Sequence, residues 1–250
     1  CAMYSAIKDN YRKKCDMVCV SDIPVTYKFI PYIDEVKNIA AFDLSREYDL
    51  VITLDVAALD RCVDAGVLFE RAKNTINIDH HQTNPLYAGV NLVKPDASAT
   101  AEVLVNLFED MGVKFSLETA VCLYVGILTD TGSFKFSNTT TNTLNCASKL
   151  LAFGVKPDVI YQKCYESQSK DMVLFQSYCV NKAEFCNDDK IAYTIVYKKD
   201  LEKFNNKGED FTDGLTEKLR AIVTTEIAFV VKEVGTGISK VSMRSKEKDI

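Results

Sequence analysis

The sequence lacks long apolar runs and a net positive charge, and it contains only two histidines. No apolar run approaches the ~20 residues that cross a bilayer, and no signal-peptide pattern opens the chain, so no contact with a membrane is expected. The net charge of −5 at pH 7 excludes a surface built to hold long nucleic acids by their phosphates. A small or terminal phosphate ligand, bound through metal ions, stays compatible with this charge.

Nine cysteines are scattered along the chain without a C-x-x-C pair, which excludes the usual patterns of a zinc site and of a disulfide framework. Reduced, mostly buried thiols in a cytoplasmic protein are the simplest account. Apolar residues make up 47% and charged residues 26%, which is ordinary for a globular protein. A chain of 250 residues can bury a sizeable core in one large domain or two modest ones.

Strands and helices alternate along the first part of the chain. Residues 50–54 form a continuous apolar run, the pattern of a strand covered on both faces, and a β-branched run at 75–78 follows. Residues 57–65 are expected to be helical and to stop at Gly66, and residues 39–42 to form a further strand. The alternation predicts an α/β fold with a mostly parallel sheet flanked by helices.

Helices dominate the middle of the chain. One helix, capped by Asp96 or Ser98, is expected to run to Gly112, and the next, capped by Ser116, to Asp130. From Ser169 a helical stripe leads into strand-like segments joined by a glycine-rich hairpin turn, which predicts a smaller, partly antiparallel α+β domain. The expected organisation is a catalytic domain at 1–165, a connecting helix or linker at 166–185 and a second domain at 186–250.

The two histidines are neighbours, His80 and His81, and they directly follow Asp79. An Asn84-Pro85 turn signal closes this stretch, and Asp55 ends the preceding strand. Because parallel strands present their carboxyl ends at one edge of a sheet, these acids and imidazoles are expected to converge there. The alternative, two histidines adjacent by chance on a loop, stays open at this point.

Asp130 ends an expected helix, where the helix dipole disfavours an acid. A divalent cation would compensate it, although an aspartate bonded in a turn before Gly132 is the more frequent case. Carboxylates with a histidine, here Asp55, Asp130 and His80, suit Mn²⁺ and, less well, Mg²⁺. Two such ions ~3.5–4 Å apart would clamp a phosphate and generate hydroxide for in-line attack. A two-ion site needs more protein ligands than Asp55, Asp130 and His80.

Several strings, taken in chain order, resemble the motifs of the DHH phosphoesterases. They are Leu54-Asp55, Asp79 to Asn84, Ala99 to Glu102 and Gly126 to Phe134. Their order and spacing most resemble the branch of nanoRNases and pAp phosphatases, the bifunctional oligoribonuclease and PAP phosphatases. A further string, 241–245, resembles the start of the substrate-binding half of the DHH-associated domain. The resemblance therefore implies a DHH catalytic domain followed by part of a DHH-associated domain.

The resemblance also implies residue roles. Asp55 would bridge two Mn²⁺ ions, with Mg²⁺ as a substitute, and His80 and Asp130 would complete the metal ligands. Asp79 would orient the site, and His81 would face the scissile phosphate as a catalytic and substrate-binding group. Three further residues would lie near the substrate: Ser242, Arg244 and Ser245. A guanidinium can fork onto a terminal phosphate, although an exposed strand arginine is the alternative for Arg244.

The implied function is a Mn²⁺-dependent phosphohydrolase that degrades short oligoribonucleotides to mononucleotides, removes phosphate from 3′-phosphoadenosine 5′-phosphate, or does both. Activated hydroxide would attack phosphorus. Three alternatives stay open: hydrolysis of cyclic dinucleotides or of pApA, an inorganic pyrophosphatase, and a catalytically silent nucleotide-binding domain. The expected partners are short oligonucleotides or small phosphonucleotides, with a homodimer left open.

Residue 1 is a cysteine that enters a helical pattern without a cap, so the sequence is expected to be part of a longer chain. The family places a histidine and two aspartates just before such a helix. It also ends with a glycine-rich stretch whose histidine grips the substrate. Both features are expected to lie outside residues 1–250.

Overall fold

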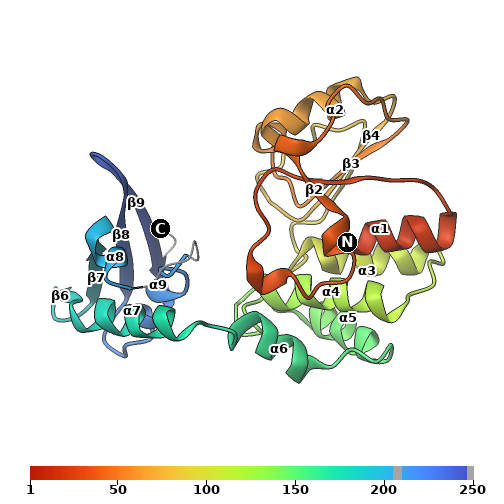
Figure 1. Cartoon of the computed structure of the whole chain (residues 1–250). Coiled ribbons are helices and arrows are strands. Elements are labelled where there is room, and N and C mark those ends of the chain that lie inside the picture. Colours follow the sequence, from red (N-terminus) through yellow and green to blue (C-terminus); the bar gives the residue numbers. More distant parts are fainter. Residues whose placement is uncertain (205–209, 247–250) are drawn as a thin grey trace. The chain divides into compact units, whose positions relative to one another are not determined.

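The computed structural model describes residues 1–204 and 210–246, which belong to two compact units, Cys1–Ser167 and Gln168–Ile250 (Figure 1). Both units combine helices with strands, which confirms the expected α/β class. Among the described residues, no helix has the length and apolar character needed to span a membrane.

The strands of unit 1, as far as they are described, form two short parallel sheets. β1 (Met17–Cys19) pairs with β2 (Val36–Asn38). β3 (Val51–Leu54), β4 (Thr75–Asp79) and β5 (Val90–Val93) form the second sheet, in that order. The runs at 50–54 and 75–78 are therefore neighbouring parallel strands, and their carboxyl ends lie side by side.

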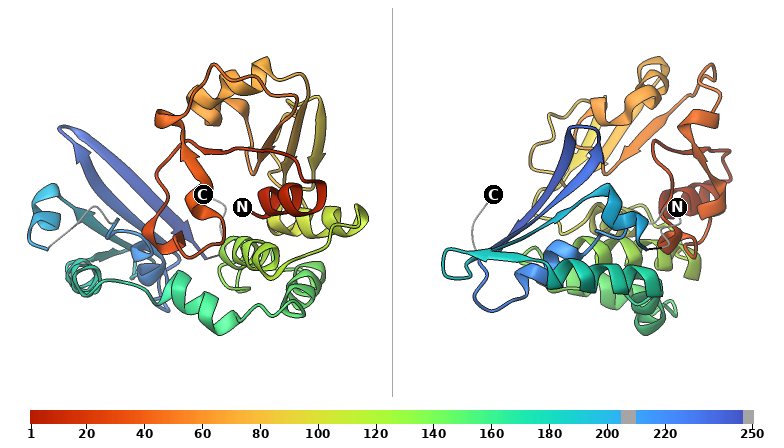
Figure 2. Two further views of the ribbon diagram at one scale, coloured as in Figure 1. Left: turned by 45° about the vertical axis from the view of Figure 1, so that its right-hand side comes forward. Right: turned by 60° about the vertical axis from the view of Figure 1, so that its left-hand side comes forward.

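Helices supply most of the core of unit 1. They are α1 (Ala2–Ala6) with a π-helical turn (Ile7–Tyr11), α2 (Gly66–Arg71), α3 (Thr100–Asp110), α4 (Leu117–Asp130), α5 (Thr141–Leu151) and α6 (Pro157–Tyr165). In Figure 2 the sheet with α2 lies at one end of this unit and α4 to α6 at the other. The apolar residues of α4 are buried against α1, α3 and α5. A Cβ atom at Gly126 would lie 2.7 Å from that of Ala101, so a glycine permits α3 and α4 to cross this closely.

Two expected elements of unit 1 are wrong. Ile39–Ala41 is a 3₁₀ turn, because the Asn38 side chain accepts the N–H of Ala40 and ends the strand before it. Leu59–Ala65 is a 3₁₀ segment interrupted at Val63, whose φ is 47°, and Gly66 begins α2 instead of ending a helix. The burial of Leu68 and Phe69 stabilises that later helix. Two shorter 3₁₀ turns are Val25–Tyr27 and Ile33–Glu35.

The caps of α3 and α4 differ in outcome. Ser116 caps α4 as predicted, because its side chain accepts the N–H of Thr119. α3 begins after Ala99, and neither Asp96 nor Ser98 caps it. The Ser98 hydroxyl instead donates to Glu102 at 2.6 Å, so a residue expected to cap the helix binds a buried carboxylate.

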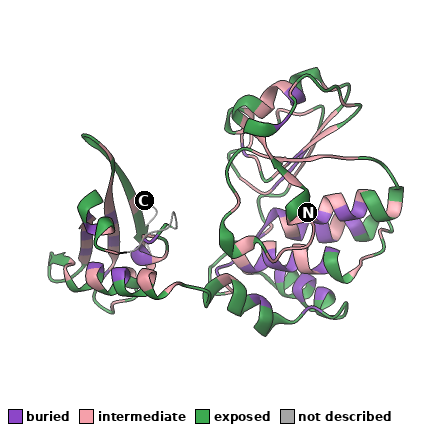
Figure 3. Ribbon diagram, in the orientation of Figure 1, coloured by how far each residue is buried: buried purple, intermediate pink, exposed green. Residues whose placement is uncertain are grey.

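Unit 2 contains a four-stranded mixed sheet with helices on one face. β6 (Glu184–Cys186), β7 (Ile191–Val196), β8 (Ile227–Gly235) and β9 (Ile238–Ser245) are neighbours in that order, and the pair β7–β8 is parallel. The helices are α7 (Lys170–Asn181), α8 (Lys198–Glu202) and α9 (Leu215–Arg220). Alternate residues of β7 are buried. Figure 3 shows the buried positions of the chain in purple.

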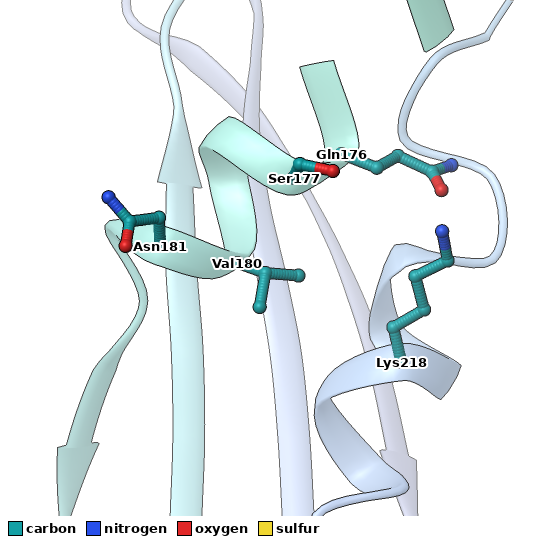
Figure 4. A pocket seen from close by; sticks show the side chains of 5 residues that line it. All are labelled: Gln176, Ser177, Val180, Asn181 and Lys218. Atoms are coloured by element: carbon teal, nitrogen blue, oxygen red, sulfur yellow. The ribbon is translucent and has the colours of Figure 1, made fainter. Parts of the chain in front are cut away.

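A groove of about 330 Å³ lies beside α7 and α9 (Figure 4) and is lined by Gln176, Ser177, Val180, Asn181 and Lys218. The fully buried Gln176 donates its amide N–H groups to the carbonyls of Phe211 and Asp213, at 3.2 and 2.8 Å. Its Oε1 atom has no partner among the described residues, but it is also shielded from solvent. The groove therefore does not offer this acceptor to solvent, and Gln176 serves to tie the 211–213 loop to α7.

The buried Asp200 of α8 is the main ionic anchor of unit 2. Its carboxylate accepts Lys182 Nζ at 2.5 Å, the Tyr178 hydroxyl at 3.0 Å and the Tyr197 N–H at 3.1 Å. Burial by itself raises the pKa of Asp200, but these three donors together outweigh it and hold the pKa below its ordinary value. The stabilisation is therefore present above the unfolded carboxyl pKa and is lost as the pH falls toward the lower folded pKa.

We predict that Asp200→Asn lowers the free energy of unfolding of unit 2 by about 2–3 kcal/mol at pH 7. The difference from wild type should shrink as the pH falls below about 4, where the unfolded carboxyl is protonated, and should vanish only below the still lower folded pKa. Urea unfolding followed by far-UV circular dichroism measures both values. Asp188→Asn, in an exposed turn of the same unit, is the matched control and should unfold like wild type. Equal stability of Asp200→Asn and this control at pH 7 would show that Asp200 anchors nothing.

Candidate metal centre

The carboxyl ends of β3 and β4 place the candidate site. Asp55 directly follows β3 with φ of 60°, a left-handed conformation that aspartate tolerates, and its N–H donates to the carbonyl of Ile78 at 3.0 Å. β4 ends at Asp79, so His80 and His81 leave the sheet beside Asp55. Asp130 comes from elsewhere in the chain, at the last residue of α4.

The structure brings these side chains together. His80 Nε2 lies 3.4 Å from Asp55 Oδ1 and 3.8 Å from Asp130 Oδ2, and His81 Nδ1 lies 3.8 Å from Asp55 Oδ1. One ligand atom each from Asp55, His80 and His81 falls within 4.8 Å of the others. The most compact group therefore consists of Asp55, His80 and His81, and Asp130 adjoins this group at His80.

Hydrogen bonds fix how the two imidazoles are turned. His80 Nδ1 lies 3.2 Å from the carbonyl of Ala97, which can only accept, so Nδ1 carries the proton and Nε2 faces the acids. His81 Nδ1 lies 2.7 Å from Asp79 Oδ1, and Asp79 is fully buried. Such a second partner behind the ring is typical of histidines that bind metals.

The electrostatics of this cluster favour a cation. The adjacent imidazole of His80 lowers the pKa of Asp55, and the Asp55 carboxylate in turn raises the pKa of His80 to about 9. Burial, assisted by the charge of Asp55, raises the pKa of Asp130 to about 6. The acids therefore attract positive charge to the centre of the cluster.

Several residues that support the site were not among the predicted ones. The Thr100 hydroxyl, in the first turn of α3, donates to Asp55 Oδ1 at 2.9 Å. The Asn138 amide donates to the carbonyls of Asp130 and Ser98, both at 3.1 Å. The string 99–102 contains Thr100, but no local pattern connects it with Asp55, which lies 45 residues away.

The three residues expected near the substrate all lie on β9. Ser242 and Arg244 pair with the buried Val230 and Ala228 of β8, and Arg244 Nε donates to Glu217 of α9 at 3.1 Å. By the alternation of a strand, Ser245 belongs to the opposite face of the sheet. The structure therefore groups Ser242 with Arg244, separates them from Ser245, and gives the arginine an acidic partner within its own unit.

The donor set fits a hard or borderline divalent cation. Carboxylate oxygens from Asp55 and Asp130, together with the imidazole nitrogen of His80, are ligands that Mn²⁺ and Mg²⁺ accept. The atoms lie too far apart for ordinary hydrogen bonds, at 3.4–3.8 Å, yet close enough to surround one ion. No cysteine belongs to the group among the described residues, which disfavours a thiolate-bound metal.

Known proteins resemble this chain in sequence and in fold. It is 38% identical over 141 residues to the bifunctional oligoribonuclease and PAP phosphatase NrnA of Thermus thermophilus, covering 55% of this chain and 40% of that protein. It is 25% identical over 213 residues to the Bacillus subtilis protein of the same name, covering 84% and 65%. The chain thus spans less than two thirds of either relative.

A solved structure and a family model extend the comparison. An exopolyphosphatase-related protein from Bacteroides fragilis superposes with a TM-score of 0.90 at 24% identity, over 99% of this chain and 74% of that one, which shows a shared fold. The model of the DHH family, N-terminal domain, matches residues 1–127. That stretch is half of the chain and contains Asp55 and the Asp79–His81 triplet, so the chain belongs to the DHH family.

Proposed function

We propose that the chain is a metal-dependent phosphohydrolase that acts on short oligoribonucleotides and on 3′-phosphoadenosine 5′-phosphate. The convergence of Asp55, His80 and Asp130 beside His81 carries this proposal. The names of the related proteins support the substrate class. Unit 1 would be the DHH catalytic domain and unit 2 part of a DHH-associated, substrate-binding domain.

The chain's own residues would divide the work. Asp55, His80 and Asp130 would hold Mn²⁺, and the chemistry supplied by bound metal is Lewis-acid stabilisation of the phosphoryl oxygens. Asp79 keeps the proton on Nδ1 of His81. Nε2 of His81 would then face a phosphate oxygen as negative charge develops on that oxygen.

Substrate binding is proposed for Ser242, Arg244 and Ser245 of unit 2. Arg244 pairs with Glu217, and a terminal phosphate would replace that carboxylate as partner of the guanidinium. The net charge of −5 is consistent with a short ligand bound by few phosphates. Homodimer formation and a cytoplasmic location stay predictions.

The test is hydrolysis of the dinucleotide pApA with Mn²⁺ by the wild type and by Asp130→Ala. Loss of one ligand should lower kcat/KM on the order of 10²-fold, because several kcal/mol of transition-state stabilisation depend on the bound metal. The matched control is Asp110→Ala. Asp110 is an exposed acid at the last residue of α3, as Asp130 is the last residue of α4, and its removal should leave the rate unchanged. Equal rates for the wild type and Asp130→Ala would contradict the metal role of Asp130.

A panel of substrates separates the alternatives. Faster turnover of cyclic than of linear diadenylate would favour a cyclic-dinucleotide phosphodiesterase. Release of phosphate from pyrophosphate alone would favour a pyrophosphatase. Nucleotide binding in the absence of bound Mn²⁺ and without turnover would identify a silent binding domain.

A further inference from the structure

A buried polar network lies behind Asp79, on the side away from the metal ligands. Asp79 Oδ1 accepts the His80 N–H at 2.8 Å and faces His81 Nδ1 at 2.7 Å. The other oxygen, Oδ2, accepts the Asn84 amide at 2.6 Å. Asn84 entered the sequence analysis only as part of a turn signal, yet it contacts the carboxylate that holds His81.

The amide of Asn84 is fixed in orientation. Its Oδ1 accepts the backbone N–H of Leu86 at 2.8 Å, and a backbone N–H can only donate. Its Nδ2 must therefore face Asp79, and the same nitrogen also donates to Asn77 Oδ1 at 2.8 Å. An aspartate at position 84 would keep the first bond and set a carboxylate oxygen against Asp79.

A second layer holds Asn77 in place. The fully buried Asn77 donates to the Thr53 hydroxyl at 3.0 Å and to the Tyr87 hydroxyl at 2.9 Å. These two hydroxyls lie 2.8 Å apart, and Tyr87 donates to the carbonyl of Val56 at 3.1 Å. The network thus runs from His81 through Asp79, Asn84 and Asn77 to the backbone just after β3.

We propose that Asn84 is a positioning residue for His81 and acts through Asp79. By holding Oδ2, Asn84 fixes the plane of the buried carboxylate and leaves Oδ1 directed at His81 Nδ1. Without Asn84 the carboxylate loses its partner at Oδ2 and rotates, and His81 loses the bond that orients its ring. The proposal rests on the proposed function for its kinetic consequences, while its structural consequence is independent of any activity.

The kinetic experiment compares Asn84→Ala with wild type in pApA hydrolysis at saturating Mn²⁺. We expect kcat to fall 10–100-fold, the usual effect of removing a residue that supports a site from behind, with KM and Mn²⁺ affinity unchanged. Asn84→Asp should lose at least as much. Tyr87→Phe, which removes only the outer part of the network, should lose less.

The matched control is Asn91→Ala. Asn91 ties the same loop, since it accepts the Ala88 N–H at 3.1 Å and donates to the Ala88 carbonyl at 2.7 Å, but it does not touch Asp79. Loss of loop order alone would affect both variants equally. A kcat for Asn91→Ala as low as that for Asn84→Ala would overturn the specific role of Asn84.

A second readout does not need turnover. The chain has two histidines, so ¹⁵N-histidine labelling gives a nuclear magnetic resonance spectrum of two imidazoles. In Asn84→Ala the hydrogen-bonded Nδ1–H signal of His81 should shift and weaken. The His80 signal, held by the Ala97 carbonyl, should stay in place. An unchanged His81 signal, or equal changes at both rings, would overturn the proposal.

The two readouts distinguish this proposal from the proposed function. If wild type hydrolyses none of the substrates but His81 alone shifts in Asn84→Ala, the positioning role stands and the proposed function fails. If wild type hydrolyses pApA and the His81 signal and kcat survive the substitution, the function stands and the positioning role fails.

Discussion

Asp55→Asn is expected to lower kcat/KM for pApA on the order of 10³-fold or more, the largest loss of activity that we predict. Asp55 Oδ1 is the atom on which the cluster centres, since it faces His80 Nε2 at 3.4 Å, faces His81 Nδ1 at 3.8 Å and accepts the Thr100 hydroxyl at 2.9 Å. Asparagine keeps the shape of the side chain and removes the negative charge that a divalent ion needs.

Metal binding and activity should fall together in Asp55→Asn. Isothermal titration with Mn²⁺ measures the first, and release of mononucleotide from pApA measures the second. Asp60→Asn replaces an exposed acid five residues further along the chain and should match wild type in both. Full activity of Asp55→Asn would exclude the proposed metal centre, whereas loss of activity with unchanged Mn²⁺ binding would move the metal to other ligands.

Glu102→Ala is expected to give the largest loss of stability, about 3–5 kcal/mol in unit 1. The buried carboxylate accepts the Ser98 N–H at 3.1 Å, the Ser98 hydroxyl at 2.6 Å, the Thr143 hydroxyl at 2.8 Å and the Asn142 amide at 2.6 Å. Burial opposes ionisation, but these donors hold the pKa of Glu102 below its ordinary value. Removing the carboxylate leaves all four donors without it, and unpaired buried donors are costly.

Hydrogen exchange of the α3 and α5 amides measures this effect for unit 1 separately. Glu109→Gln is the matched control, because Glu109 also links α3 to α5, through Lys149 at 2.7 Å, but on the surface. That substitution should cost less than about 1 kcal/mol. If the α3 and α5 amides are equally protected from exchange in Glu102→Ala and Glu109→Gln, Glu102 is not the anchor that its hydrogen bonds indicate. Glu102→Ala should also loosen the 97–98 segment, whose Ala97 carbonyl contacts His80 Nδ1.

The convergence of the acidic and imidazole side chains at the site could be predicted from the sequence. The apolar runs before Asp55 and Asp79 identified two buried strands, and parallel strands must present their ends at one edge. The unfavourable position of Asp130 at a helix end suggested a compensating cation, the motif resemblance made it a predicted ligand, and it does approach His80. The motif resemblance to the DHH family is confirmed by the family model over residues 1–127. The roles of these residues remain proposals.

Local pattern failed where a neighbour in space decides the structure. β5 was not predicted, because four residues carry only a weak strand pattern of their own. The strand forms because these residues pair with β4. Gly66 was expected to end a helix, and the burial of Leu68 and Phe69 makes it begin one. The face that Arg244 shares with Glu217 likewise depends on how β9 lies against α9.

By itself the sequence determined the chemistry of this protein: the two adjacent histidines, the acids at strand and helix ends, and the order of the motifs. Only the tertiary structure decided what supports them. Glu102 accepts hydrogen bonds from Ser98, next to the Ala97 carbonyl that contacts His80, and Asn84 donates to Asp79, which contacts His81; the motifs did not predict either bond. A polar side chain removed from water must find a partner, and which partner it finds is set by the packing of helices and strands.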